Sequence, residues 1–259
     1  MPHARTMPDA VLLPTGEVLI VNGAGTGISG YGNVVDQVGA SNADDPVLTP
    51  VLYDPAARAG ERFSTGGMPT SDIPRLYHSV ATLTPNADVM IAGSNPNLDR
   101  SEVKYGTEYR VEWLGPAYLK RERPQIVSEI PRLLGFGQTL QMKIRLPAAS
   151  LQGANVKGAS LLSHVLSDIE HELNIFIVAL MDLGYVTHAV HANSRMVYLV
   201  SSLSDDKTTL TITGPPNGNI YPPGPGFIYV VADGVPSTGR KLLVGEGRSP
   251  AVDYPALEK

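Results

Sequence analysis

Tyr77 and His78 are the residues whose types and spacing best suit chemistry, because an adjacent phenol and imidazole could act on one target. Residues 80–83 alternate like a strand, and successive side chains of a regular strand point to opposite faces. The pair can therefore share a target only at the strand end, where the backbone is irregular. Pro74 favours such a break, because proline fixes its own φ and pushes the preceding residue toward extended geometry. Taken alone, such a dipeptide is more often a surface pair or a packed core pair.

The composition favours a β-protein with many turns. The 259 residues include 26 glycines and 22 prolines, which favour short strands over long helices. This length suits one large domain or two smaller ones. A net charge of −5 without a basic stripe argues against nucleic acid or an anionic membrane surface as partner. No apolar run approaches the length of a membrane span.

Cysteine is absent from the 259 residues, so they offer neither disulfides nor thiolate metal ligands. The first five residues lack the hydrophobic stretch that is typical of a signal peptide. These two observations leave the cellular compartment open.

A hairpin pattern occurs twice, over residues 5–23 and again seventy residues later, over residues 75–93. Each copy has the order strand, turn, strand, glycine, which predicts repeated hairpins of the kind that build propeller blades. Met7-Pro8 of the first copy aligns with Tyr77-His78, so the second copy carries chemical groups that the framework does not require. The matching positions are Arg5 and Arg75, Leu13 and Leu83, Leu19 and Val89, Val21 and Ile91, and Gly23 and Gly93.

The spacing of the two copies is long for one blade, and the polar residues 25–45 are interpreted as a loop insertion. Outer strands are expected over residues 47–53 and 109–114. Trp113 lies in the second of these strands, and alternation predicts that it packs between blades rather than forming a stacking platform.

The sequence pattern changes after Arg121. Residues 124–131 are expected to form a linker, and about seven short strands with turn signals then predict an immunoglobulin-like β-sandwich. The clearest expected strands are residues 135–144, 178–182, 188–200, 208–213 and 226–232.

Residues 158–177 do not fit this sandwich, because their apolar residues have the spacing of an amphipathic helix. His164, Asp168, His171 and Glu172 could be drawn as a metal cluster on one helical face. Their order matches no dedicated metal-binding motif, so a solvated helical face is the preferred interpretation.

Residues 73–79 and 187–195 resemble the C-terminal half of glyoxal oxidase, a fungal copper-radical oxidase related to galactose oxidase. The similarity runs along nearly the whole chain. It implies an all-β fold in which partial kelch-type β-propeller blades (residues 1–120) precede an immunoglobulin-like, early-set β-sandwich (residues 121–259). It also implies that a hairpin of the sandwich reaches the propeller axis and supplies a histidine. Further matching stretches are residues 7–9, 48–53, 181–184 and 215–218.

The resemblance implies one copper ion held by Tyr77, His78 and His188. Tyr77 would be the axial phenol and the catalytic base, and the two histidines would be equatorial ligands. Two imidazoles with phenolate oxygens suit Cu(II) chemically. His191 lies three positions after His188, so alternation points it to the other face, and it is interpreted as structural.

The activity implied by the resemblance is oxidation of a small aldehyde to a carboxylic acid, with reduction of O2 to hydrogen peroxide. In that family, a second tyrosine cross-linked to a cysteine holds a radical. The axial tyrosine takes the hydroxyl proton of the hydrated aldehyde, and the complete enzymes are secreted.

The sequence departs from the family pattern in three ways. Only about two blades precede Arg121, so strand edges stay open that a closed propeller would pair. No cysteine is present, so the Tyr–Cys radical cofactor cannot form in this chain. Residues 158–177 interrupt an expected junction between Lys157 and Val178, and we interpret them as a translated intron.

Three functional hypotheses follow. The chain could be part of a glyoxal-oxidase-like enzyme. It could be a non-catalytic propeller and sandwich protein with at most a vestigial copper site. In the third hypothesis, Tyr77, His78 and His188 merely pack together in a structural module.

Overall fold

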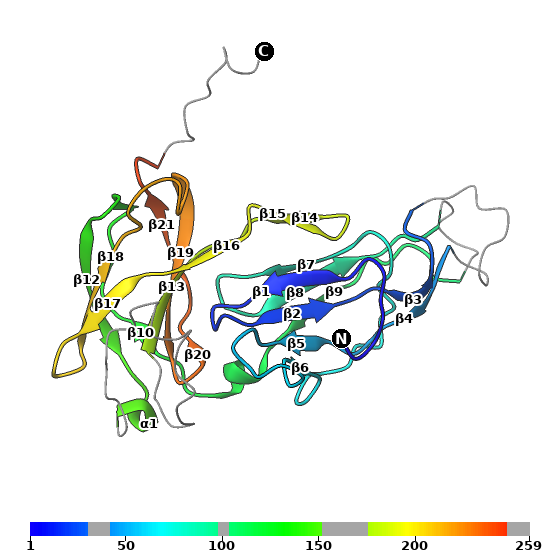
Figure 1. Cartoon of the computed structure of the whole chain (residues 1–259), viewed down its shortest axis with the longest axis horizontal. Coiled ribbons are helices and arrows are strands. Elements are labelled where there is room, and N and C mark those ends of the chain that lie inside the picture. Colours follow the sequence, from blue (N-terminus) through cyan, green and yellow to red (C-terminus); the bar gives the residue numbers. More distant parts are fainter. Residues whose placement is uncertain (31–41, 98–103, 152–175, 248–259) are drawn as a thin grey trace, which may run out of the picture. The chain divides into compact units, whose positions relative to one another are not determined.

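The computed structural model describes residues 1–30, 42–97, 104–151 and 176–247. The chain forms two compact units, each treated by itself below (Figure 1). The first unit comprises Met1–Arg121 and Leu183–Arg195, and the second comprises Glu122–Asp182 and Met196–Lys259. Residues 183–195, which the sequence analysis assigned to the sandwich, are therefore grouped with the blades.

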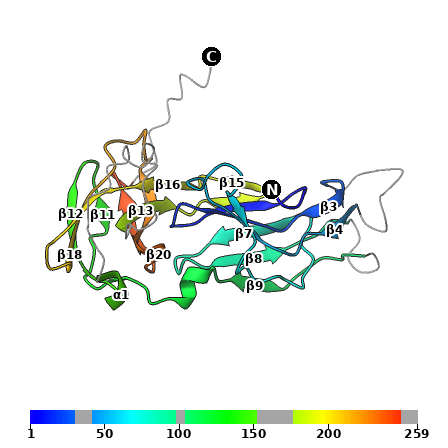
Figure 2. The same ribbon diagram turned by 60° about the horizontal axis from the view of Figure 1, so that its bottom comes forward.

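Two blade-like antiparallel sheets dominate the first unit, and the three strands of the second sheet lie side by side in Figure 2. The first sheet has the order β1-β2-β5-β6, and the second has the order β7-β8-β9. A short pair of strands, β3 and β4, lies in the region that was interpreted as a loop insertion. The bounds are β1 Asp9–Leu12, β2 Val18–Val21, β3 Ala24–Gly27, β4 Ala43–Pro46, β5 Val51–Tyr53, β6 Phe63–Ser64, β7 Ser79–Leu83, β8 Val89–Gly93, β9 Val111–Leu114 and the 3-10 helix η1 Ala117–Lys120.

The predicted repeat of hairpins is confirmed by the strands β1–β2 and β7–β8. Four apolar positions of each hairpin are buried, and each is at most 6% exposed. Alternation within each hairpin places these side chains on one face, so their burial accounts for the pattern in the sequence. They are Val11, Leu13, Leu19 and Val21 in the first hairpin, and Ala81, Leu83, Val89 and Ile91 in the second. Equivalent positions in the strand pairing are seventy-one rather than seventy residues apart, since Leu12 pairs with Val18 and Leu83 pairs with Val89.

The backbone at the start of the inner strands corrects the sequence alignment by one residue. Ala24 N donates to Thr6 O, and Asn95 N donates to Tyr77 O in the equivalent bond. Met7 and His78 both have positive φ, at 54° and 63°. Thr6-Met7, rather than Met7-Pro8, is thus the counterpart of Tyr77-His78. The irregular backbone belongs to the shared framework, and only the phenol and imidazole are additions.

The expected outer strands form as β5 and β9, but the prediction for Trp113 is wrong. Its side chain is 62% exposed, whereas the next residue, Leu114, is 6% exposed. Trp113 pairs with Met90, while its neighbour Glu112 pairs with the buried Ile91. Alternation along β9 therefore sends Trp113 to the face of the second sheet that lies opposite the buried one.

The second unit is an immunoglobulin-like sandwich, as predicted. One sheet has the order β10-β12-β18-β17, and the other has the order β11-β21-β19-β13-β16 with β20 paired to β19. Apolar residues of both sheets form one core, including Met142 and Ile212 from the first and Leu180 and Val230 from the second. The bounds are β10 Gln125–Ile126, β11 Leu133–Leu134, β12 Thr139–Arg145, α1 Ala148–Leu151, β13 Phe176–Asp182, β16 Arg195–Tyr198, β17 Val200–Leu203, β18 Thr209–Thr213, β19 Gly224–Ala232, β20 Val235–Pro236 and β21 Arg240–Val244.

Several boundaries differ from the sequence expectations. The predicted linker at 124–131 contains β10, which pairs with β12. The strand expected at 188–200 is instead divided among β15 (Val190–Ala192), β16 and β17. A tight turn occupies its first two residues, and Asn193, with a φ of 59°, lies in the break between β15 and β16. The strand expected to resume at Val178 already begins at Phe176. The rest of the segment 158–177, including His164, Asp168, His171 and Glu172, lies outside the described residues.

No helix among the described residues is both long and apolar enough to cross a membrane.

Candidate metal centre

A hairpin of the first unit carries His188 at its tip. Strands β14 (Tyr185–Thr187) and β15 pair antiparallel, with Thr187 opposite Val190. The two residues between them, His188 and Ala189, have φ values of 52° and 61°. Two consecutive left-handed residues form the type I′ turn, whose twist matches that of the flanking strands. The imidazole is therefore presented at the tip of the hairpin.

This hairpin lies beside β7 and β1, and it brings His188 to His78 (Figure 1). The two Nε2 atoms are 2.9 Å apart, although the residues are 110 positions apart in the sequence. Their ring centroids are 4.7 Å apart and the ring planes are nearly perpendicular, at 83°. The two histidines selected from the sequence thus direct the same ring nitrogen toward a common point.

Tyr77 completes the cluster. Its ring stacks on His78, with centroids 3.8 Å apart and an interplanar angle of 26°. Its ring centroid is 6.0 Å from that of His188. Adjacent side chains can stack in this way because the left-handed backbone of His78 interrupts strand alternation just before β7. All three residues selected from the sequence are therefore brought together.

Two further residues support the histidines, and the sequence analysis did not identify either role. Thr187 Oγ1 lies 2.7 Å from His188 Nδ1. At Gly93, an added Cβ would lie only 2.7 Å from the carbonyl oxygen of His78, and Gly93 itself has a φ of 73°. The sequence signals were the position of Thr187 just before His188 and the glycine that closes each hairpin repeat.

The surroundings of His78 favour its neutral imidazole form. The pKa of His78 lies below its ordinary value, chiefly because burial disfavours the charged form. Charge on the nearby His188 lowers the pKa of His78 further. A neutral imidazole is the form that binds metal ions.

The donor arrangement fits a tetragonal metal ion. Metal–imidazole bonds are about 2.0–2.1 Å long, so two such ligands at a right angle have nitrogens about 2.9 Å apart. The observed separation of the two Nε2 atoms is 2.9 Å. No group of three or more His, Cys, Asp or Glu side chains among the described residues is arranged to hold a metal ion. Two imidazoles with a phenol are therefore the candidate donor set, and such N,O sets suit Cu(II).

The surroundings of the cluster include a glycine and a separate histidine. A Cβ added at Gly30 would lie 4.0 Å from Tyr77 Oη, so backbone rather than side chain stands beside the phenol oxygen. His191 does not join the pair, since its Nε2 lies 2.9 Å from Leu183 O.

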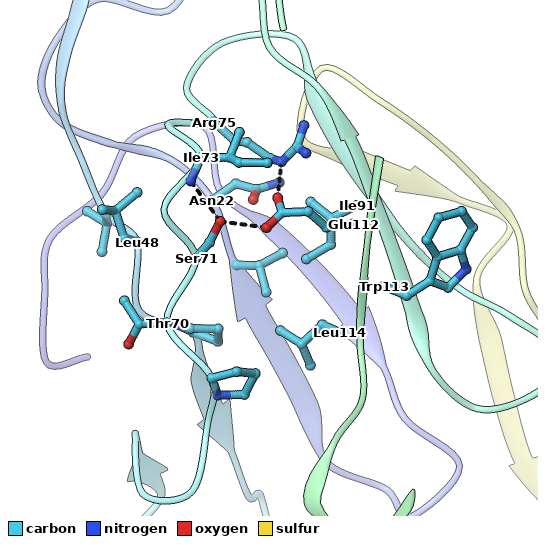
Figure 3. Close-up of a pocket in the computed structure, with 14 residues that line it drawn as sticks. Asn22, Leu48, Thr70, Ser71, Ile73, Arg75, Ile91, Glu112, Trp113 and Leu114 are labelled. Carbon is cyan, nitrogen blue, oxygen red and sulfur yellow. Dashed lines mark hydrogen bonds and ion pairs between the residues drawn. The ribbon is translucent and has the colours of Figure 1, made fainter. Parts of the chain in front are cut away.

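A cavity of about 120 Å³ lies elsewhere in the first unit, and its lining contains none of the three cluster residues (Figure 3). Its polar wall consists of Arg75, Glu112 and Ser71. Arg75 Nε and Ser71 Oγ each donate to Glu112 at 2.7 Å. Arg75 Nη1 and Nη2 donate to the backbone carbonyls of Gly93 and Arg110. These groups bind one another, so the cavity is a poor candidate for ligand recognition.

Comparisons with known proteins show what the chain is similar to. The sequence model of the glyoxal oxidase N-terminus matches residues 1–118, and that of the galactose oxidase-like early set domain matches residues 123–244. The chain is therefore similar to glyoxal oxidase and galactose oxidase along nearly its whole length.

Two plant proteins are similar along almost the entire chain. Aldehyde oxidase GLOX1 of Arabidopsis thaliana is 33% identical over 94% of the chain, and aldehyde oxidase GLOX of Vitis pseudoreticulata is 32% identical over 93%. The chain spans only 36% and 41% of the lengths of these two proteins. Both are plant proteins, so the resemblance is not confined to the fungal members that the sequence analysis named.

A solved structure shares the fold. It is a fungal alcohol oxidase of the AA5 family in complex with copper, with a TM-score of 0.68 and 20% sequence identity. The match covers 95% of this chain and 43% of that protein.

Proposed function

We propose that Tyr77, His78 and His188 bind copper as part of a copper-radical oxidase that acts on aldehydes. The observation that carries this proposal is the pair of Nε2 atoms 2.9 Å apart with the Tyr77 ring stacked beside them. In a purely structural module the same two nitrogens would form one hydrogen bond, and copper titration separates that alternative from a metal site.

Each residue has a distinct role in this proposal. His78 and His188 would hold the metal through Nε2. Tyr77 holds or releases a proton at Oη, where it can accept the hydroxyl proton of a hydrated aldehyde. Copper, when bound, supplies one-electron redox chemistry.

Aldehydes are the proposed substrates because two relatives are named aldehyde oxidases. A hydrated aldehyde would lose two electrons and two protons to O2, which gives a carboxylic acid and hydrogen peroxide. The resemblance to secreted oxidases supports an extracellular setting for this reaction.

The complete reaction needs a second one-electron centre besides copper. In the family pattern this is a tyrosine cross-linked to a cysteine, and these 259 residues contain no cysteine. We therefore propose that these residues supply the copper ligands and the phenol base, and that turnover needs a cysteine they do not contain.

Copper titration of the protein tests the site. We expect one Cu(II) per chain, with a tetragonal electron paramagnetic resonance (EPR) spectrum that contains two nitrogen ligands. His78→Ala and His188→Ala should each remove the site, while Tyr77→Phe should keep copper but change the spectrum. His3→Ala controls for binding by the exposed N-terminal histidine. Equal copper binding by the wild type and both histidine variants would overturn the proposal.

The absence of cysteine favours one second candidate, a copper-binding protein without oxidase activity. Oxygen consumption with glyoxal or methylglyoxal, measured on the copper-loaded polypeptide that the full native transcript encodes, separates the two. Stoichiometric peroxide formation would support the oxidase, and copper binding by that polypeptide without oxygen consumption would support the second candidate.

A further inference from the structure

We propose that Thr187 is a positioning residue, which holds the ring of His188 by accepting the Nδ1 hydrogen through its hydroxyl oxygen. This inference rests on the proposed copper site, and it adds a supporting residue that neither the family match nor the relatives assign.

The geometry of the hairpin carries the inference. Thr187 Oγ1 lies 2.7 Å from Nδ1 of His188, and Nε2 of the same ring lies 2.9 Å from His78. Nδ1 of His188 is thus within hydrogen-bonding distance of Thr187, while Nε2 of the same ring faces His78. A ring that rotated about its χ2 bond would lose both contacts.

Threonine is suited to this task at position 187. Its backbone is fixed by pairing with Val190 across the turn. Its side chain is β-branched, which restricts χ1. The hydroxyl therefore has a fixed place, and an imidazole on the exposed tip of a hairpin needs such a neighbour to keep one orientation.

The proton inventory gives the direction of the bond. A neutral imidazole carries one hydrogen, on Nδ1 or on Nε2. When Nε2 serves as a metal ligand, the hydrogen must reside on Nδ1, and Thr187 Oγ1 is the acceptor beside it. Partners that hold the second nitrogen of a metal-binding histidine typically change metal affinity about 10- to 100-fold.

The test uses Thr187→Val, which keeps the shape and β-branching but removes the hydroxyl, and Thr187→Ser, which keeps the hydroxyl. We expect Thr187→Val to weaken Cu(II) binding about 10-fold or more and to broaden the nitrogen hyperfine pattern of the EPR spectrum. Thr187→Ser should bind copper within about 3-fold of the wild type, because it keeps the hydroxyl and so avoids the roughly 10- to 100-fold effect of losing that hydrogen-bond partner. Thr65→Val, the same change at another exposed threonine of the unit, should match the wild type.

A second measurement does not depend on copper. Nitrogen-15 chemical shifts of His188 in the metal-free protein report which ring nitrogen carries the hydrogen. We expect the Nδ1–H form in the wild type and in Thr187→Ser, and loss of that preference in Thr187→Val.

The outcomes separate this inference from the copper proposal. If the wild type binds no copper, the proposed function fails, and the nitrogen-15 shifts alone decide the role of Thr187. If the wild type binds copper and Thr187→Val binds it equally tightly with an unchanged spectrum, the positioning role is overturned while the copper site stands.

Discussion

Left-handed backbone conformations at three residues build the histidine pair. His78, His188 and Ala189 have φ values of 63°, 52° and 61°. An L-residue pays about 1–2 kcal/mol for this conformation, and type I′ turns prefer Asn-Gly at their centre. The turn instead contains His-Ala, so its sequence is poor for stability and good for presenting an imidazole. Such local strain is typical of functional sites.

Ala189→Gly is expected to stabilise the protein, since glycine adopts positive φ without the Cβ penalty. The gain should be about 0.5–1 kcal/mol in the free energy of unfolding, after the larger unfolded-state entropy of glycine is subtracted. Urea denaturation measures it. Ala192→Gly, in strand β15 of the same hairpin, should have the opposite sign, and equal effects at both positions would contradict the turn assignment.

Asp9 is a carboxylic acid in a buried environment that disfavours its charged form. Its side chain is 2% exposed, and burial raises its pKa to about 7. Burial outweighs the opposing hydrogen bond from Asn22 Nδ2 at 3.0 Å. The folded state therefore binds this proton more tightly than the unfolded state, in which the pKa is near 3.8. The stabilisation is complete below about pH 4 and is lost as the pH rises through 7.

Asp9→Asn should flatten the dependence of stability on pH. Linkage gives a wild-type loss of about 2 kcal/mol in unfolding free energy between pH 5 and pH 8 from this group, and the variant should not show it. Denaturation at several pH values tests this. Val11→Ala, in the same strand, should lower stability at every pH and leave the slope unchanged, and an unchanged slope in Asp9→Asn would contradict the assignment.

At the scale of elements, one arginine connects the strands of the second blade. Arg75 is 2% exposed, and it donates to Gly93 O at the end of β8, to Arg110 O just before β9 and to Glu112 in β9. Arg5 has a related role in the first blade, where it donates to Asn22 O and to Thr49 O. The arginine repeat seen in the sequence thus has a mechanical cause, because a planar guanidinium can bridge several strands at once.

Arg75→Lys should destabilise the protein by about 2–3 kcal/mol, because an ammonium keeps the charge but cannot reach all three acceptors. The same change at Arg110, whose side chain is 62% exposed and paired with Glu108, should have little effect. Similar midpoints for the two variants in urea would show that the bridging bonds contribute little.

The sequence predicted those elements whose residues repeat or alternate, namely the two hairpins and the sandwich core. Tyr77 and His78 stood out because the first hairpin copy lacks them, whereas His188 was selected through the resemblance to glyoxal oxidase. The sequence analysis missed features that depend on one residue of register. Trp113 lies on the face opposite the buried one, and a turn takes the place of the first two residues of the expected strand 188–200, because His-Ala carries no turn signal.

At the scale of the whole molecule, copper should act as a cross-link. The two imidazoles are 110 residues apart, so a metal that binds both favours the folded chain over the unfolded one. At a free copper concentration 100 times the dissociation constant, the unfolding free energy should rise by about 2.7 kcal/mol. Calorimetric scans with and without Cu(II) measure this. His188→Ala should show no shift, and an equal shift in that variant would place the stabilising copper elsewhere.

The path of the chain has a consequence for how the protein is made. The polypeptide leaves the first unit after Arg121, returns at Leu183 and leaves again after Arg195. At a synthesis rate of about 5–20 residues per second, His188 emerges from the ribosome roughly 5–20 seconds after His78. Throughout that interval the nascent chain contains His78 but not His188. The proposed copper site therefore cannot form before the hairpin that carries His188 has been made.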